Sequence, residues 1–227
     1  MVIGGFTAQN IARIVVMVVI VMLSTVLHEV AHAAAANALG DPTAKERGRL
    51  TLNPIAHLHP VGSFLLPLIM GIAGGPILAF AKPVPYNPRR LRKPLRDEVL
   101  VALAGPACNL VQACVGTLAF RSLATLAYGV MPQDVWYFVF GAVADYVYLN
   151  LMLMFFNLIP LPPLDGSSIV SPLLRGRARD LYYTVQQNAL PILLAVMYLV
   201  PMVFKVDPVG RYLEFTAGRL ASLMLGY

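Results

Sequence analysis

The chain has 227 residues, of which 58% are hydrophobic and only 12% are charged, with a mean hydropathy of +0.71. A soluble domain of this length carries about twice that charged fraction, so composition excludes a soluble domain and predicts a polytopic membrane protein. The formal charge of +6 is weak evidence for acidic partners, because lysine and arginine in membrane proteins mostly report orientation. We expect the lipid bilayer, and no nucleic acid, as a partner.

Four stretches of the sequence are long and apolar enough to span a bilayer as helices. They run over about residues 11–39, 99–128, 136–160 and 189–204, and a span needs about 20 residues. The first ends at Gly40-Asp41-Pro42, a signal that ends helices, and the fourth is short unless it begins near Tyr183. The tail from Val209 to Leu225 is typical of an amphipathic helix at the membrane interface.

The stretch 61–81 is also long enough to span, but glycines and prolines interrupt it repeatedly. The loops on either side of it, 40–60 and 82–96, are both basic. A spanning helix would put these loops on opposite sides of the membrane, whereas a re-entrant hairpin puts both on one side. The positive-inside rule prefers the hairpin, and a cavity must then shield its backbone. We therefore expect the N-terminus outside and the basic loops inside.

The segment 82–88 contains three prolines, which exclude helix and force extended backbone. It could form an exposed strand edge. The predicted fold class is thus an all-α polytopic membrane protein with about four transmembrane helices, a re-entrant hairpin and a short extended or β segment. The sequence holds no hydrophilic block long enough for a second folded domain, which predicts one integral-membrane domain over 1–227.

The first predicted span contains the sequence His28-Glu29-Val30-Ala31-His32. Side chains at positions i and i+4 of a helix lie one turn apart on the same face, so both imidazoles can reach one ion. Glu29 projects from the adjoining face, close enough to take a proton from a water whose pKa zinc lowers to near 7. Three ionisable groups at membrane depth are costly to bury without a function, which favours a zinc site over simple contacts between helices.

A catalytic zinc needs a third protein ligand and one open position. The candidates for the third ligand are His57, His59, Asp145 and Asp165. Loop polarity explains His57 and His59 adequately, and the depth of Asp145 in its span matches that of His28 poorly. Asp165 follows prolines that break the third span at its inner end, towards the same side of the membrane as the two histidines. We therefore expect Asp165 to be the third ligand.

The second predicted span contains the sequence AGPACN at 104–109. Small residues of this kind let neighbouring helices approach closely. Asn109 is a polar side chain in an apolar stretch and needs a partner. It could donate a hydrogen bond to a developing oxyanion, or it could tie helices together, and the residues leave both interpretations open.

Together these motifs resemble those of the site-2 protease family of intramembrane zinc metalloproteases. The resemblance covers most of the chain and rests on HEVAH at 28–32, GDPTAKERGRLTLNPIAH at 40–57, FAKPVPYNPR at 80–89, AGPACN at 104–109 and NLIPLPPLDG at 157–166. It implies that His28, His32 and Asp165 bind one Zn²⁺ per chain and that Glu29 is the general base. It also implies that Asn109 assists near the active site, and that the hairpin and the segment 82–88 shape substrate access.

The chain looks like the minimal type of this family, without the PDZ or CBS domain of other members. One departure is His59, where an acidic residue is expected. The organisation that follows comprises a zinc helix at 11–39, a re-entrant and strand region at 40–96, helices at 97–130 and 136–168, and a C-terminal helix and tail at 182–227.

The expected function is hydrolysis of peptide bonds in or near the transmembrane segments of substrate proteins, as in regulated intramembrane proteolysis. The expected location is the cell membrane, with several passes and with the active site towards the cytoplasm. Two alternatives stay in view. One is a metal or proton transporter with Asp145 and the histidines as relay groups. The other is a catalytically inactive membrane scaffold, which would have no need of Glu29.

Overall fold

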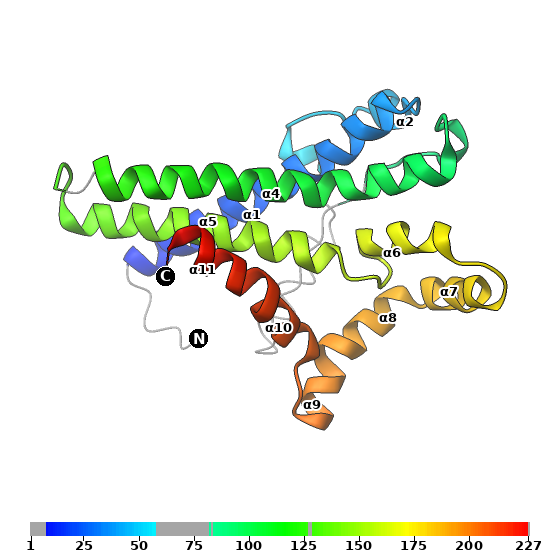
Figure 1. Ribbon diagram of the computed structural model, residues 1–227. Helices are drawn as coiled ribbons and strands as arrows, with labels where there is room; N and C mark the ends of the chain where they lie inside the picture. Colours follow the sequence, from blue (N-terminus) through cyan, green and yellow to red (C-terminus); the bar gives the residue numbers. More distant parts are fainter. Residues whose placement is uncertain (1–7, 58–81, 83, 127–128, 227) are drawn as a thin grey trace.

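The computed structural model describes residues 8–57, 82, 84–126 and 129–226, and this part of the chain is mostly helical (Figure 1). The elements are α1 (Ala8–Ala38), α2 (Thr43–Glu46), η1 (Pro54–His57), η3 (Pro88–Arg90), α4 (Pro94–Leu126), α5 (Gln133–Asn157), α6 (Asp165–Val170), η4 (Ser171–Leu173), α7 (Arg177–Gln187), α8 (Ala189–Leu194), η5 (Ala195–Leu199), α9 (Val200–Phe204), α10 (Pro208–Leu213), η6 (Glu214–Gly218) and α11 (Arg219–Leu225). These ranges include no strand. The predicted hairpin at 61–81 lies outside the described residues.

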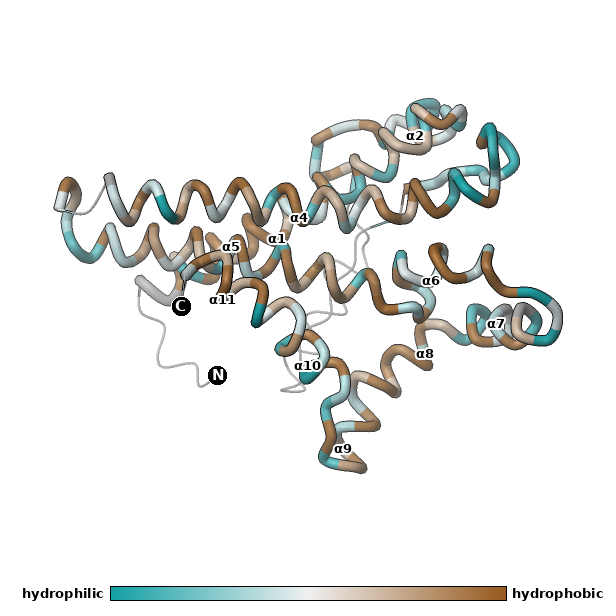
Figure 2. The backbone as a smooth tube through the Cα atoms, viewed as in Figure 1, coloured by the Kyte–Doolittle hydropathy of each residue, from teal (hydrophilic) through white to brown (hydrophobic). Residues whose placement is uncertain are grey.

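The helices α1, α4 and α5 are long and apolar enough to cross a membrane. They match the first three predicted spans, although α4 begins five residues before the predicted start at residue 99. In Figure 1, α4 and α5 run antiparallel side by side, and α1 packs against both. Figure 2 shows apolar residues along all three helices and polar residues gathered near α2, η3 and α7.

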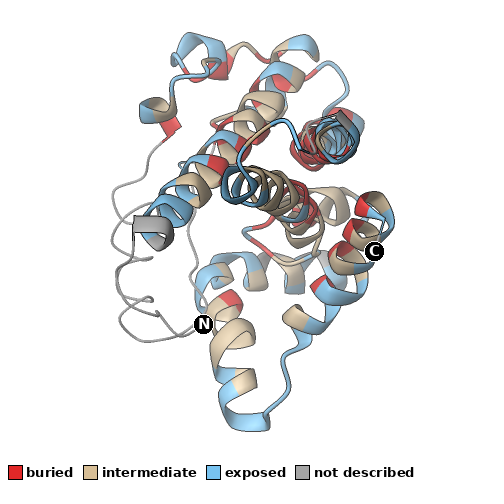
Figure 3. Cartoon of the chain, turned by 90° about the vertical axis from the view of Figure 1, so that its left-hand side faces the viewer, coloured by how far each residue is buried: buried red, intermediate tan, exposed pale blue. Residues whose placement is uncertain are grey.

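Burial in this three-helix bundle follows the contacts between the helices. In Figure 3, many of the residues where α1, α4 and α5 meet are buried, whereas the outward surfaces are exposed. Large apolar side chains such as Ile14, Val18 and Leu118 point outward and are more than half exposed. Lipid is the solvent that makes such a surface favourable, which agrees with a membrane protein.

The helix that the predicted organisation extends over 136–168 differs from the structure at its C-terminal end. The helix predicted over 136–168 is two helices, because α5 ends at Asn157 and α6 begins only at Asp165. The turn between them contains Pro160, Pro162 and Pro163. Proline has no backbone N–H to donate and its ring clashes with the preceding helical turn, so the chain leaves the helix and re-enters one at Asp165.

The fourth predicted span, 189–204, forms a continuous helical run through α8, the π-turn η5 and α9. It does not extend back to Tyr183 in a straight line, because α7 joins it across Asn188 with a bend of 79°. It therefore counts as a span only together with α7, as a bent pair.

The tail forms a continuous helix from α10 to α11 that packs one face on α4 and α5. Ala217, Ala221 and Leu225 are buried in the same cluster as Ala113 and Leu151 of those helices. The opposite face carries exposed Phe215 and Leu223. The predicted amphipathic helix is present with a protein-facing side, and its place at the membrane interface stays a prediction.

Candidate metal centre

His28, His32 and Asp165 lie together where α1, α4 and the start of α6 meet. The Nε2 atoms of His28 and His32 are 3.0 Å apart. The Oδ2 atom of Asp165 is 3.1 Å from Nε2 of His28 and 3.3 Å from Nε2 of His32. One turn of α1 aligns the two imidazoles, and the proline-rich turn after α5 brings Asp165 to them. One ligand atom from each residue lies within 4.8 Å of the others, so the three side chains could hold one metal ion.

The close approach of α4 to the two imidazoles depends on Gly105. A Cβ atom at this position would overlap Nε2 of His32 and the ring of His28. Gly166, directly after Asp165, has a similar role because a Cβ atom there would overlap the carbonyl oxygens of Leu158 and Ile159. The small residues noted in the sequence therefore serve the site itself, besides general helix packing.

Hydrogen bonds on the far side of each imidazole fix which nitrogen carries the proton. Nδ1 of His32 is 2.7 Å from the carbonyl oxygen of Val101, and Nδ1 of His28 is 2.6 Å from Oδ1 of Asn109. Both oxygens only accept hydrogen bonds, so each neutral ring carries its proton on Nδ1. Each Nε2 then presents a lone pair, and both lone pairs point towards Asp165.

The resulting donor set fits Zn²⁺. Oδ2 of Asp165 is buried and has no hydrogen-bond partner in the described part of the chain. When both rings are neutral, two imidazole lone pairs and one carboxylate oxygen therefore face one another, and a bound cation would remove the repulsion among them. Two histidines and one carboxylate, with one open position, form a ligand set of catalytic zinc sites.

Glu29 lies next to His28 on α1 and contacts the non-helical segment 84–87. Its Oε2 atom accepts a hydrogen bond of 3.0 Å from the backbone N–H of Val84. The Val84 side chain is buried with Ala33 of α1 and Ala44 of α2. The segment is thus seated on the zinc helix itself. Sequence reasoning placed the segment near the site only by family resemblance, and nothing in it pointed to this contact.

Asp41 attaches the same segment to the end of α1. Its fully buried carboxylate accepts hydrogen bonds from the N–H and hydroxyl groups of Thr43 and from the N–H of Asn87. Burial acts to raise the pKa of Asp41, but these donors and the Arg90 guanidinium outweigh it and lower the pKa below its ordinary value. The carboxylate therefore stays ionised at neutral pH and holds the segment.

Tyr86 of this segment makes a second polar contact, with Glu98 of α4. Its hydroxyl lies 3.3 Å from Oε1 of Glu98, to which it donates a hydrogen bond. Burial, and then the charge of Glu98, raise the pKa of Tyr86 to about 12. The phenol is therefore neutral at physiological pH and serves as a donor.

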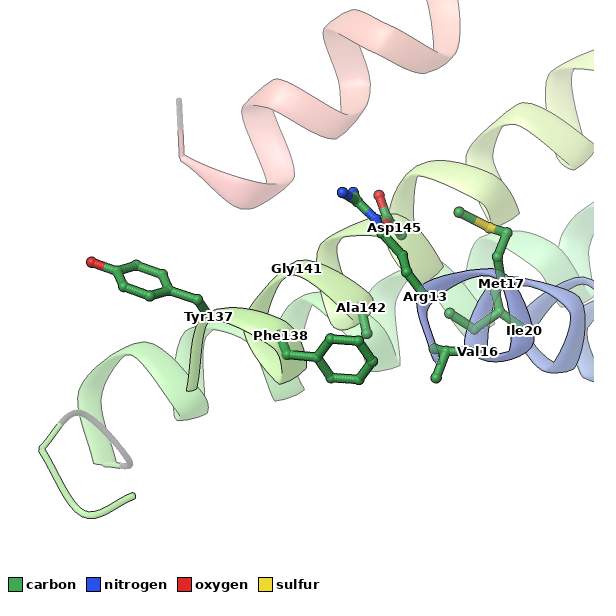
Figure 4. Close-up of a pocket in the computed structure, with 9 residues that line it drawn as sticks. All are labelled: Arg13, Val16, Met17, Ile20, Tyr137, Phe138, Gly141, Ala142 and Asp145. Carbon is green, nitrogen blue, oxygen red and sulfur yellow. The ribbon is translucent and has the colours of Figure 1, made fainter. Parts of the chain in front are cut away.

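The other candidates for the third ligand lie elsewhere. Asp145 is paired with Arg13 at 3.4 Å, beside a cavity of about 130 Å³ near the N-terminal end of α1 (Figure 4). His57 is buried, and its Nε2 lies 2.9 Å from the carbonyl oxygen of Thr51, within its own loop. His59 lies outside the described residues. The structure thus brings together His28, His32 and Asp165, and keeps Asp145 and His57 apart from them.

Asn109 contacts the centre through its side-chain amide. Oδ1 faces His28, and Nδ2 donates a hydrogen bond of 2.9 Å to Oδ1 of Asn150 on α5. Both ends of the amide are therefore engaged, and a contact with a developing oxyanion stays a prediction. Sequence reasoning missed Asn150, although a polar residue inside an apolar span is a signal that could have found it.

Comparisons with known proteins agree with this geometry. The family model described as peptidase family M50 matches residues 125–200, which include α5 and Asp165. YwhC of Bacillus subtilis is 37% identical over 92% of this chain and 90% of its own length. Rip2 of Mycobacterium tuberculosis is 32% identical over 87% of this chain and 73% of its own length. Both are named as candidate zinc metalloproteases.

No solved structure gives a significant match to the chain. The similarity to YwhC, however, extends over nearly the whole of both proteins. The chain belongs to peptidase family M50, the site-2 protease family, and is a zinc metalloprotease.

Proposed function

We propose that the protein hydrolyses peptide bonds in or near the transmembrane segments of other membrane proteins, with Zn²⁺ held by His28, His32 and Asp165. The observation that carries this proposal is the convergence of two imidazole nitrogens and one carboxylate oxygen, within 4.8 Å of one another, next to Glu29 on α1. The centre lies on α1, a helix apolar enough to span the membrane. Substrates whose cleaved bonds lie at membrane depth suit a centre in that position.

The residues of the chain divide the work of hydrolysis. A bound zinc ion lowers the pKa of water and polarises a carbonyl group. Glu29, next to His28 on the helix, takes a proton from the attacking water. As the water oxygen bonds to the carbonyl carbon and the C–N bond breaks, Glu29 gives that proton to the leaving amine. The products are a carboxylic acid and an amine, and Glu29 is regenerated.

Substrate presentation would depend on the extended segment that contacts Glu29. A helical peptide bond shields its own carbonyl group, so a transmembrane substrate has to unwind locally before attack. The segment 84–87 is not helical and lies on the zinc helix. It could pair with the unwound substrate by β-augmentation. A strand here and a re-entrant hairpin at 61–81 belong to this proposal, as does a role in regulated intramembrane proteolysis.

The proposed orientation places the centre towards the cytoplasm in a multi-pass cell-membrane protein. Basic residues gather in the loops, the short helices α2 and η3 and the first turn of α4, at the end of the bundle that contains the zinc centre. They are Lys45, Arg47, Arg49, Arg89, Arg90, Arg92, Lys93 and Arg96. The positive-inside rule assigns such loops to the cytoplasmic side.

The test is cleavage of a panel of model transmembrane peptides by purified protein, comparing wild type with Glu29→Gln. Glutamine keeps the shape of the side chain but cannot take a proton, so the rate should fall by about 10²- to 10⁴-fold while bound zinc is retained. Glu46→Gln is the matched control, because Glu46 is exposed and pairs with Arg90 away from the centre. A chelator should abolish wild-type cleavage.

Other outcomes would point elsewhere. Equal cleavage by wild type and Glu29→Gln would remove Glu29 from the mechanism. Zinc or proton flux into liposomes that survives Glu29→Gln, without cleavage, would favour a transporter.

A further inference from the structure

Three polar side chains meet in the middle of the three-helix bundle, behind the metal centre. Ser24 of α1, Asn109 of α4 and Asn150 of α5 each have 0% of their surface exposed. Nδ2 of Asn150 lies 3.0 Å from Oγ of Ser24 and 3.0 Å from the carbonyl oxygen of Tyr146. Buried polar groups at membrane depth are costly unless they are paired, and here all the amide groups are paired.

The direction of this hydrogen-bond chain is fixed at its far end. The carbonyl oxygen of Tyr146 can only accept, so the atom of Asn150 that faces it is the donor Nδ2. Oδ1 of Asn150 then faces Asn109 and accepts from its Nδ2. Oδ1 of Asn109 is left to face Nδ1 of His28, which must therefore donate. The orientation of the Asn150 amide therefore sets the orientation of the Asn109 amide, which in turn sets which nitrogen of His28 carries the proton.

From this chain we propose that Asn150 is a positioning residue of the metal centre: through Asn109 it holds the His28 proton on Nδ1 and keeps Nε2 free for zinc. The inference rests on the proposed function in taking His28 as a zinc ligand. The hydrogen bonds of Asn150 go to Asn109, Ser24 and Tyr146, none of them a metal ligand, so it acts by setting the orientation of the Asn109 amide. Ser24 connects the chain back to α1, so all three spans are joined at this level.

The support of His32 shows why such a relay matters for His28. His32 donates directly to a backbone carbonyl, that of Val101, whose polarity cannot reverse. A side-chain amide can rotate by 180° and exchange its oxygen for its NH₂ group. If the Asn109 amide did so, it would donate to Nδ1 of His28 and drive the proton to Nε2, which would block metal binding. Asn150 removes that alternative.

The central variant is Asn150→Leu, which has a similar volume but no hydrogen-bonding groups. Nδ2 of Asn109 then loses its acceptor, and the amide is free to reverse. We expect zinc affinity to fall by about 10- to 100-fold, as it does when groups that orient metal ligands are removed. Asn150→Asp should stay within about threefold of wild type when its carboxyl group is protonated, because the O–H then donates to the Tyr146 carbonyl and the other oxygen still accepts from Asn109.

Two further variants separate this role from a general effect on packing. Thr117→Val is the matched control: Thr117 is a buried hydroxyl of α4 that donates to Ala113 within its own helix. It should leave zinc affinity unchanged. In an Asn109→Asp background, position 109 presents only acceptor oxygens when ionised. Asn150→Leu should then cause no further loss, whereas a merely structural defect would add its full effect to that background.

The experiment uses the full chain in detergent and measures two quantities. Zinc affinity is obtained by competition with a chelator. In the metal-free protein, ¹⁵N spectra of labelled histidine report the tautomer of His28, whose signals are assigned by their loss in His28→Gln. The wild type should carry the proton on Nδ1, and Asn150→Leu should show a mixture of both tautomers.

The outcomes separate the relay from the proposed function. If Asn150→Leu leaves both the tautomer and the zinc affinity unchanged, the relay is overturned, and zinc binding by the wild type still supports the proposed function. If the wild type binds no zinc while Asn150→Leu shifts the tautomer, the relay stands and the proposed function fails.

Discussion

Near each end of α1, ionisable side chains of the helix face an aspartate from another helix, but the two sites differ in charge. Near its N-terminal end, Arg13 of α1 pairs with Asp145 of α5, and the two side chains are 67% and 30% exposed (Figure 4). In its C-terminal half, His28 and His32 face Asp165, with their Nε2 atoms 3.1 and 3.3 Å from its Oδ2 atom. The first arrangement contains its own cation, whereas the second needs one from outside. An aspartate at membrane depth therefore indicates a metal site only where the protein supplies no countercharge.

Packing is also tighter at the metal centre than at the Arg13–Asp145 end of α1. At the metal centre α4 approaches the imidazoles so closely that Gly105 cannot carry a Cβ atom. Gly141, which lines the cavity beside Arg13 and Asp145, has nothing within 4 Å of where its Cβ atom would lie. Close packing orients the ligands at the centre, and the looser end has no such requirement.

The largest expected effect comes from removing Asp165, with removal of Asp145 as the comparison. Asp165→Ala deletes one of three zinc ligands and should abolish zinc retention and peptide cleavage together. Asp145→Ala should keep zinc, because Asp145 contributes no atom to the centre. The measurement is zinc content per chain after purification. Full zinc occupancy in the Asp165 variant would contradict the ligand assignment and erase the contrast between the two ends.

The second comparison adds a single methyl group at each end. Gly105→Ala places a Cβ atom against His28 and His32, so α4 must shift or the rings must turn. We expect weaker zinc binding and a loss of stability of about 1–3 kcal/mol, typical of overpacking. Gly141→Ala meets open space and should be neutral. Chelator competition and thermal unfolding of both variants provide the check, and a tolerated Gly105→Ala would mean that the centre is loosely packed after all.

The smallest expected effect concerns pH and the attachment of the segment 84–87. Folding lowers the pKa of Asp41. The stabilisation from its carboxylate is thus fully present above the unfolded-state pKa of about 3.9, and it is lost as the pH falls through the lower folded value. The protection of this segment's backbone amides, measured as their exchange rate compared with that of an unfolded chain at the same pH, should therefore stay constant from pH 7 to pH 5. In more acidic solution the protection should fall.

Asp41→Asn is the control for that measurement. It should remove the acid dependence and raise the exchange at neutral pH, because one amide oxygen replaces two carboxylate oxygens. An unchanged acid dependence in Asp41→Asn would show that another group holds the segment.

The sequence was sufficient for features encoded within a few neighbouring residues. Composition indicated the membrane, and the helical period put His28 and His32 on one face, because both depend only on local order. The prolines after Asn157 predicted the end of the third span for the same reason. The prediction of one helix over 136–168 was wrong, because the chain leaves the helix after Asn157 and enters a new one only at Asp165.

What only the tertiary structure decided are the contacts between groups far apart in the chain. The sequence offered four candidates for the third ligand, and folding placed Asp165 against the histidines and Asp145 against Arg13. The partners of the imidazoles, Val101 and Asn109, lie 69 and 81 residues away from them, and Asn150 was not foreseen. The physical reason is that hydrogen bonds need a geometry set by how whole helices pack, whereas spacing within one helix is set by its own backbone.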